Sequence, residues 1–251
     1  MHRLGVIRHL QRGRLTRVID LVAILGITVF SAFLSGSRTW AGFNSPDSEF
    51  YASLAIFGSD VTDRALEPAY TWTRLGYIAP VRLLVMTADP WVGFAVWRFL
   101  LLLVLVGSIY LLVKRASGRP LAVGVALFAS LNTMVLSYVG NPYLTGAILA
   151  ATTLFLALAA WCAIGAPRSR WLPGALSGLV AGWLVMLNPY ALFLALSMWL
   201  AVRAIGLLGD SERRWRHLVI DVGAALFGFA VSMGVFLAAG AVIFPGRSWL
   251  G

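Results

Sequence analysis

Cysteine and histidine are scarce in this sequence, and the short motifs of several enzyme classes are missing. Cys162 is the only cysteine among 251 residues, which excludes disulfides within the chain and cysteine-based metal sites. The three histidines, His2, His9 and His217, are not clustered along the chain. The P-loop, the glycine-rich dinucleotide motif, the zinc-protease H-E-x-x-H and the hydrolase G-x-S-x-G are all absent. The sequence therefore carries none of these nucleotide-binding, metalloprotease or hydrolase motifs.

Charged residues are also scarce, at 12%, whereas hydrophobic residues make up 60% of the chain and the mean hydropathy is +0.84. Soluble domains rarely reach such values, so the composition predicts a polytopic membrane protein. The net charge of +10 comes from arginines beside apolar segments rather than from one nucleic-acid-binding face. We therefore expect membrane lipids with anionic headgroups as partners, and no nucleic acid. The excess of arginine over lysine is typical of GC-rich bacterial genes.

Apolar runs of about 18 residues or more, long enough to cross a bilayer as helices, recur along the chain. They lie at Val18–Ser35, Trp91–Val113, Leu121–Tyr138, Tyr143–Ile164, Leu172–Leu187, Pro189–Leu208 and Leu218–Phe244. The expected fold class is thus an all-α membrane protein with about seven transmembrane helices, with six or eight as open alternatives. The fifth and sixth runs are predicted to form a tight hairpin. The first run follows a basic stretch without a clear cleavage site, so we expect an uncleaved anchor.

Basic residues predict the orientation of these helices. Four groups flank alternate helix ends: Arg3, Arg8, Arg12, Arg14 and Arg17; Lys114, Arg115 and Arg119; Arg168 and Arg170; Arg203, Arg213, Arg214 and Arg216. If seven helices alternate, all four groups face one side, which the positive-inside rule makes cytoplasmic. We expect a multi-pass plasma-membrane protein with a cytoplasmic N-terminus, a basic tail at 1–17 and a transmembrane module at 18–251. Asp20 and Asp221 are expected at the cytoplasmic interface.

The loop Gly36–Pro90 between the first two runs is then predicted to lie outside. It gathers six of the ten acidic residues: Asp47, Glu49, Asp60, Asp63, Glu67 and Asp89. Because most of the carboxylates of an apolar protein meet in this loop, it is the first place to look for acid–base chemistry.

Two surface helices are expected within this loop. Ser45 suits a helix N-cap, Pro46 the first helical position, and Asp47 the first turn, while Gly58 suits the end. An apolar stripe along this helix predicts that it lies on the membrane surface; its members are Phe50, Leu54 and Phe57. The second segment, 71–88, is too short and too charged to span, so a surface or re-entrant helix is predicted.

Asp47 and Glu49 form the most suggestive pair of carboxylates. Two acids just after a helix start, beside Phe50 and Tyr51, could supply a general base and a ligand for a divalent cation such as Mg²⁺ or Mn²⁺. The alternative is that Asp47 only caps the surface helix and Glu49 faces water.

Arginines outside the cytoplasmic groups point to an anionic ligand. Arg64, Arg74 and Arg82 lie in the outer loop, and Arg98 lies within the second apolar run. Guanidinium groups beside an interfacial cleft suit phosphate or pyrophosphate, and a charge at membrane depth usually faces a cavity or a partner. The alternative is that these arginines pair with Asp60, Asp63 or Glu67, or reach lipid headgroups.

Two small patterns concern packing. Asn141-Pro142-Tyr143 and Asn188-Pro189-Tyr190 are expected as asparagine caps followed by proline in the first helical turn. The second pattern, Gly174, Gly178 and Gly182, repeats every four residues, which lets another helix approach closely, either within the chain or from a second subunit.

At the segment Pro46-Asp47-Ser48-Glu49-Phe50-Tyr51-Ala52 the chain resembles the GT-C superfamily of membrane glycosyltransferases, including the protein-mannosyltransferase and aminoarabinose-transferase relatives. The resemblance implies an essential acid near the start of a large outer loop with two juxtamembrane helices. It also implies a seven-helix N-terminal module with its active site outside.

By this resemblance the reaction is sugar transfer from a polyprenyl-phosphate donor, a lipid-linked sugar, to an acceptor outside the membrane. Asp47 takes the place of the catalytic base, with Glu49 as a near competitor or a helper. The substrate-binding residues implied are Tyr51, Asp60, Asp63, Arg64, Arg74, Arg82 and Arg98. Because such enzymes usually continue well past the seventh helix, we expect a minimal module, a fragment, or a subunit that needs a partner or forms a homo-oligomer.

Two other functions stay open. A transporter or flippase would need polar residues along a path through the helices, and the third to sixth runs carry almost none beyond Asn132. A non-catalytic membrane assembly subunit would suit the short length and the glycine stripe.

Overall fold

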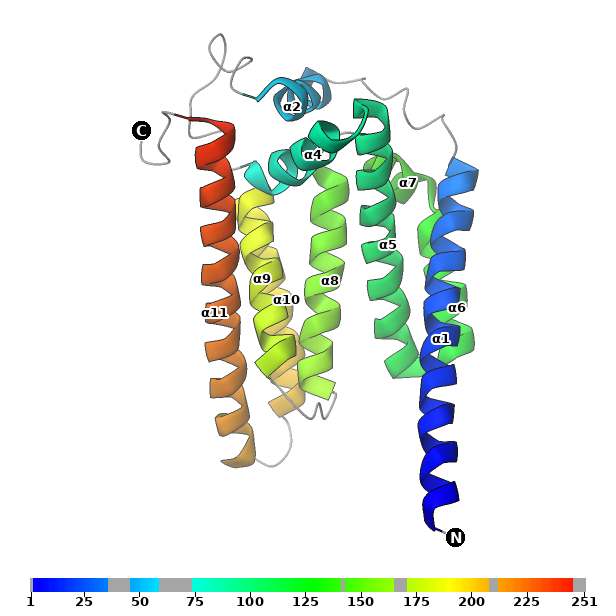
Figure 1. Cartoon of the computed structure of the whole chain (residues 1–251). Helices are drawn as coiled ribbons and strands as arrows, with labels where there is room; N and C mark the ends of the chain where they lie inside the picture. Colours follow the sequence, from blue (N-terminus) through cyan, green and yellow to red (C-terminus); the bar gives the residue numbers. More distant parts are fainter. Residues whose placement is uncertain are drawn as a thin grey trace.

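The computed structural model describes residues 2–35, 46–58, 74–140, 143–164, 171–207 and 212–245, and in these ranges every regular element is a helix. Long helices run side by side, and two short helices, α2 (Pro46–Phe57) and α4 (Leu75–Thr87), lie across one end of them (Figure 1). The others are α1 (His2–Ser35), α5 (Pro90–Ser117), α6 (Arg119–Leu131), α7 (Thr133–Gly140), α8 (Leu144–Ile164), α9 (Trp171–Leu187), α10 (Pro189–Leu207) and α11 (Glu212–Ile243). The predicted all-α class is therefore confirmed for these residues.

Several of these helices are long and apolar enough to cross a membrane. Four described stretches qualify by length and composition: Leu15–Leu34, Pro90–Ser117, Leu144–Cys162 and Leu218–Ile243. The pair α6 and α7 adds a fifth span if the two helices are counted as one. The apolar helix α9 and the stretch Pro189–Ala201 of α10 are shorter. The chain is thus a multi-pass membrane protein by its helices, and the count of seven spans stays a prediction.

One predicted span, Leu121–Tyr138, is broken in the structure. The axes of α6 and α7 differ by 62° at Asn132. This residue takes an extended backbone conformation, with φ −61° and ψ 127°, and its Oδ1 accepts a hydrogen bond of 2.9 Å from the Met134 amide. Asn132 therefore ends one helix and caps the next, which a purely apolar pattern does not reveal.

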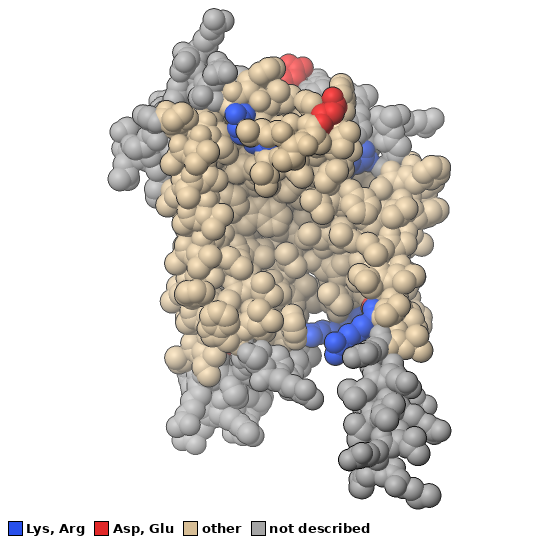
Figure 2. Space-filling model, viewed as in Figure 1, with Lys and Arg blue, Asp and Glu red and all other residues tan. Residues whose placement is uncertain are grey.

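On one face of the molecule, the charged side chains of the described residues lie near the two ends (Figure 2). On the face in Figure 2 the basic and acidic residues of the described part lie near the top and the bottom, with an uncharged band between. In Figure 1 the N-terminal end of α1, the α5–α6 junction, the end of α8 and the start of α11 all lie at one end, opposite α2 and α4. This arrangement is the one that the alternating basic segments require.

Asp20 and Asp221 are buried, at 8% and 1% exposure. Asp20 forms ion pairs with Lys114 and Arg119 and accepts a hydrogen bond of 2.8 Å from the Tyr110 hydroxyl. This ion cluster lies between α1, α5 and α6, where three donors replace water around the carboxylate. Asp221 is covered because α9 packs closely against α11 at this point, where a Cβ at Gly174 would lie 3.0 Å from the Asp221 carbonyl oxygen. The position of both residues at the cytoplasmic interface stays a prediction.

Glycines bring α9 and α11 into direct backbone contact. A Cβ atom at Gly178 would lie 1.9 Å from the Ala225 carbonyl oxygen, and one at Gly228 would lie 2.0 Å from that of Ala175. The predicted glycine stripe therefore packs within the chain. The Asn188 cap is also confirmed, since its Oδ1 accepts from the Tyr190 amide at 3.1 Å, whereas Asn141 lies outside the described residues.

Candidate functional site

The two short helices form a cap over one end of the helix bundle, and α4 is the part that anchors it (Figure 1). Pro80 lies within α4, so the Gly76 carbonyl lacks its normal helical donor. The indole Nε1 of Trp183 in α9 donates to that carbonyl instead, at 2.9 Å. Gly76 also lies so close to α9 that a Cβ there would be 2.8 Å from the Leu187 nitrogen. The start of α4 is therefore fixed on the end of α9.

Two of the predicted phosphate-binding arginines cap helix ends. Arg74 Nη1 donates to the carbonyl of Leu187, the last residue of α9, at 2.8 Å. Arg82 Nη1 donates to the carbonyls of Ala55 and Ile56 near the end of α2, at 3.3 and 3.2 Å. A positive charge is favourable at a helix C-terminus because of the helix dipole. The sequence predicted acidic side chains or lipid headgroups as the alternative partners of these arginines, whereas the structure gives them backbone carbonyls.

Gly58 ends α2 directly against Arg82. Its φ of +63° lies in the left-handed region, as expected for the glycine that terminates a helix. A Cβ at this position would lie 2.8 Å from Cζ of Arg82, so the guanidinium packs flat on the glycine. The predicted end of the first loop helix is therefore confirmed, and it fixes the position of the Arg82 charge.

Below this arginine, a groove of about 600 Å³ runs between α4 and α11. Its lining is Ala79, Pro80, Arg82, Leu83 and Met86 from α4 and Val235, Phe236, Ala238, Ala239, Val242 and Ile243 from α11. Arg82 is the only charged residue of this lining. The groove is therefore an apolar channel with one cationic residue in its lining, a combination suited to a lipid with a phosphate headgroup.

Aromatic side chains fill the space beneath the cap. Tyr51 of α2 contacts Tyr77 of α4 and Tyr143 at ring-centroid distances of 6.1 and 5.6 Å. Tyr77 then contacts Trp97 at 6.2 Å, and Trp97 contacts Trp183 at 6.3 Å. Edge-to-face contacts of this kind stabilise a cluster beyond its simple burial. The predicted substrate contact Tyr51 is fully buried in this aromatic cluster, so it holds α2 in place.

Two polar atoms in the aromatic cluster remain without a partner. The Tyr77 hydroxyl and the Trp97 Nε1 are buried, and neither forms a hydrogen bond within the described part of the chain. Burial also raises the pKa of the Tyr77 hydroxyl far above its usual range, so it stays neutral. The aromatic cluster therefore has two hydrogen-bond donors, the Tyr77 hydroxyl and the Trp97 Nε1, directly beneath the cap.

Only some of the acidic residues of the outer loop lie in the part of the chain that the structure describes. Asp47 lies in the first turn of α2, and its side chain is outside the described residues. Glu49 is exposed. The predicted Asp60, Asp63 and Arg64, and with them Glu67, lie outside the described residues. The fourth predicted arginine, Arg98, is half-buried in α5.

The metal site predicted at Asp47 and Glu49 stays a prediction. Both positions lie within α2, and residues two apart in a helix lie about 200° apart around its axis. In the part of the chain with described side chains, no group of three or more His, Cys, Asp or Glu residues could hold a metal ion, and the Asp47 side chain lies outside that part.

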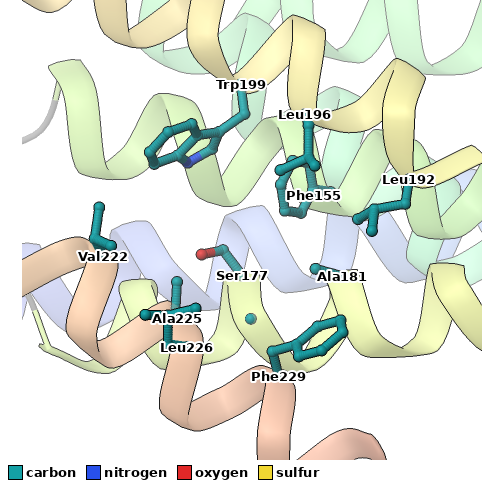
Figure 3. Close-up of a pocket in the computed structure, with 11 residues that line it drawn as sticks. Phe155, Ser177, Ala181, Leu192, Leu196, Trp199, Val222, Ala225, Leu226 and Phe229 are labelled. Atoms are coloured by element: carbon teal, nitrogen blue, oxygen red, sulfur yellow. The ribbon is translucent and has the colours of Figure 1, made fainter.

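A second cavity, of about 330 Å³, lies between α8, α9, α10 and α11 (Figure 3). Its lining carries no charged residue, and the Ser177 hydroxyl already donates to the Gly174 carbonyl at 2.7 Å. Such a cavity has little to orient a sugar or a phosphate. The groove under Arg82 is therefore the better candidate site.

Sequence reasoning missed the contributions of α11 and of the aromatic cluster. Tyr77, Trp97 and Trp183 come from three helices, so no local spacing brings them together. Comparison with known families, curated proteins and solved structures gives no match in any of the three.

Proposed function

We propose that this chain is a membrane glycosyltransferase of the GT-C type, with about seven spans and with α2 and α4 on the outer side of the plasma membrane. It would transfer a sugar from a polyprenyl-phosphate donor to an acceptor outside. The observation that carries the proposal is the apolar groove between α4 and α11, with Arg82 as the charged residue of its lining.

The shape of the groove suits an isoprenoid lipid. Its α11 wall runs from Val235 to Ile243, about 12 Å at 1.5 Å per residue, close to one hydrocarbon leaflet. The prenyl chain would lie along this wall, and the phosphate would meet Arg82. Both hydrogen bonds from Arg82 to α2 use Nη1, and a guanidinium has five N–H donors in total. Arg82 can therefore hold α2 and contact a phosphate oxygen at once.

The chemistry would proceed by direct displacement at the sugar. The acceptor hydroxyl oxygen attacks the anomeric carbon, and the bond from that carbon to the phosphate oxygen breaks. Asp47, in the first turn of α2, takes the hydroxyl proton, and Arg82 offsets the charge on the departing polyprenyl phosphate. With a single base the configuration inverts. The helical register gives no support to a metal shared by Asp47 and Glu49, so no step uses one.

The decisive experiment compares Asp47→Asn with Glu49→Gln at matched expression. Membranes are supplied with a panel of radiolabelled polyprenyl-phosphate hexoses and pentoses, and sugar transfer is measured. We expect Asp47→Asn to lower transfer at least about 100-fold, because general-base catalysis typically contributes that much, and Glu49→Gln to lower it less than about tenfold. Full activity of Asp47→Asn would refute the proposal.

A second pair of variants tests the groove itself. Ala239→Phe fills it, whereas Ala241→Phe adds the same ring to α11 outside the lining. We expect only Ala239→Phe to raise the donor KM, with kcat little changed, since binding of the prenyl chain is lost and the reacting groups are untouched.

A further inference from the structure

A separate groove lies near the opposite end of the molecule, between α1, α5 and α8. It has a volume of about 560 Å³. Its lining is Leu21, Ile24 and Leu25 of α1; Leu103, Val104, Gly107, Ser108, Leu111 and Arg115 of α5; and Leu154, Ala157, Leu158 and Trp161 of α8. The lining is apolar along most of its length and carries a single charged residue, Arg115. Nothing in the proposed transferase chemistry uses this groove.

The charged end of this groove is built from α5 and α8. The Arg115 guanidinium lies over the Trp161 ring, with Cζ 5.3 Å from the ring centroid. Nearby, Lys114 and Arg119 both bind the Asp20 carboxylate. Two cations share this one carboxylate and Arg115 adds a third positive charge beside them, so these four residues have a net positive charge. Arg115 is exposed as a residue, so an anion can approach its side chain.

The length of this groove matches one leaflet. From Leu103 to Arg115, the α5 wall covers about 18 Å at 1.5 Å per residue, compared with about 15 Å for half of a hydrocarbon core. The Ser108 hydroxyl also lines the groove, and it is buried without a hydrogen-bond partner among the described residues. Trp161 beside Arg115 is typical of the level where headgroups meet acyl chains.

We propose that this groove holds one acyl chain of an anionic phospholipid from the leaflet nearest the N-terminal end of α1, with Arg115 bound to the lipid phosphate. Charge complementarity selects this occupant: an uncharged helix from a second copy would leave Arg115 and the net positive charge unmatched. The Asp20 ion cluster beside it adds to the positive charge because its one carboxylate offsets only one of its two cations, Lys114 and Arg119. The site is independent of the proposed donor groove under Arg82.

The test measures lipid binding to the full-length protein in detergent by native mass spectrometry. The probes are phosphatidylglycerol and phosphatidylcholine with identical acyl chains. We expect preferential binding of phosphatidylglycerol, and a decrease of about fivefold in its binding to Arg115→Gln, as expected for loss of one basic contact near an anionic surface. Gly107→Leu should decrease binding of the same lipid by filling the groove, since the nearest atom to a Cβ there is Cγ2 of Ile24 at 3.7 Å.

Matched controls separate the groove from charge and bulk in general. Arg17→Gln removes a cation from the same end of α1, and Gly124→Leu adds a side chain where nothing lies within 4 Å. Both should bind phosphatidylglycerol like the parent protein. Equal binding of the two lipids, or unchanged binding by both groove variants, would overturn the proposal. So would a dimer that Gly107→Leu abolishes while lipid binding persists, because the groove would then hold a second copy.

Discussion

Single side chains hold the cap in place by supplying donors to backbone carbonyls that the helices leave without one. Trp183 donates a hydrogen bond to the Gly76 carbonyl, which has no helical donor because residue 80 is proline. Arg74 and Arg82 donate to carbonyls at the ends of α9 and α2. Each of these bonds joins elements far apart in the sequence. The role of each of these side chains therefore depends on tertiary contacts, and the sequence around it does not reveal that role.

The Trp183 bond predicts coupling between two positions. Trp183→Phe should lower the free energy of unfolding by about 1–2 kcal/mol, because the buried Gly76 carbonyl loses its donor. In a Pro80→Ala background the backbone amide that the substitution restores can reach the same carbonyl, so the loss on Trp183→Phe should be smaller. A double-mutant cycle in a reversible denaturation assay measures this coupling. Equal losses in both backgrounds would show that the indole acts only through its packing.

At the scale of helices, the sequence pattern predicted most boundaries well. The starts and ends of α5, α8, α9 and α10 lie within a few residues of the predicted runs, because long apolar stretches bounded by Pro, Gly and Arg determine them locally. The break at Asn132 was missed because a single polar residue interrupts an otherwise apolar run. The candidate groove was missed because its walls, α4 and α11, meet only through tertiary packing.

The α9–α11 contact predicts that a Gly→Ala substitution has opposite effects on stability at two positions. In Gly178→Ala the new Cβ would lie 1.9 Å from the Ala225 carbonyl oxygen, so α9 and α11 must move apart. We expect this change to lower the free energy of unfolding by several kcal/mol. Gly223→Ala, on α11, meets nothing within 4 Å and should stabilise the protein by up to about 1 kcal/mol through helix propensity.

Thermal unfolding of both variants in the same detergent distinguishes the two cases. The parent protein is the reference, and Gly228→Ala, which meets the Ala175 carbonyl oxygen at 2.0 Å, should behave like Gly178→Ala. If Gly178→Ala were as stable as Gly223→Ala, the close backbone contact of α9 and α11 would be wrong.

For the whole molecule, two chemically different ends are separated by an apolar band. The capped end combines an exposed acid on α2 with Arg82 and its groove. The other end has Lys114 and Arg119 paired with Asp20, and Arg115 lies next to them in the chain. The 28 residues of α5 connect the two ends over about 42 Å, more than the hydrocarbon thickness of about 30 Å. If α5 spans the bilayer, its two ends must therefore face opposite compartments.

Cysteine labelling tests this orientation directly. Cys162 is buried and is the only cysteine, so Cys162→Ala gives a background without thiols. In that background, Glu49→Cys on α2 should react with a membrane-impermeant maleimide on intact cells, because Glu49 is exposed at the capped end. Ser117→Cys, exposed at the far end of α5, should react only after permeabilisation, because the positive-inside rule assigns that end to the cytoplasm. The reverse pattern would place the cap and its groove inside the cell, where the proposed transfer to an outer acceptor could not take place.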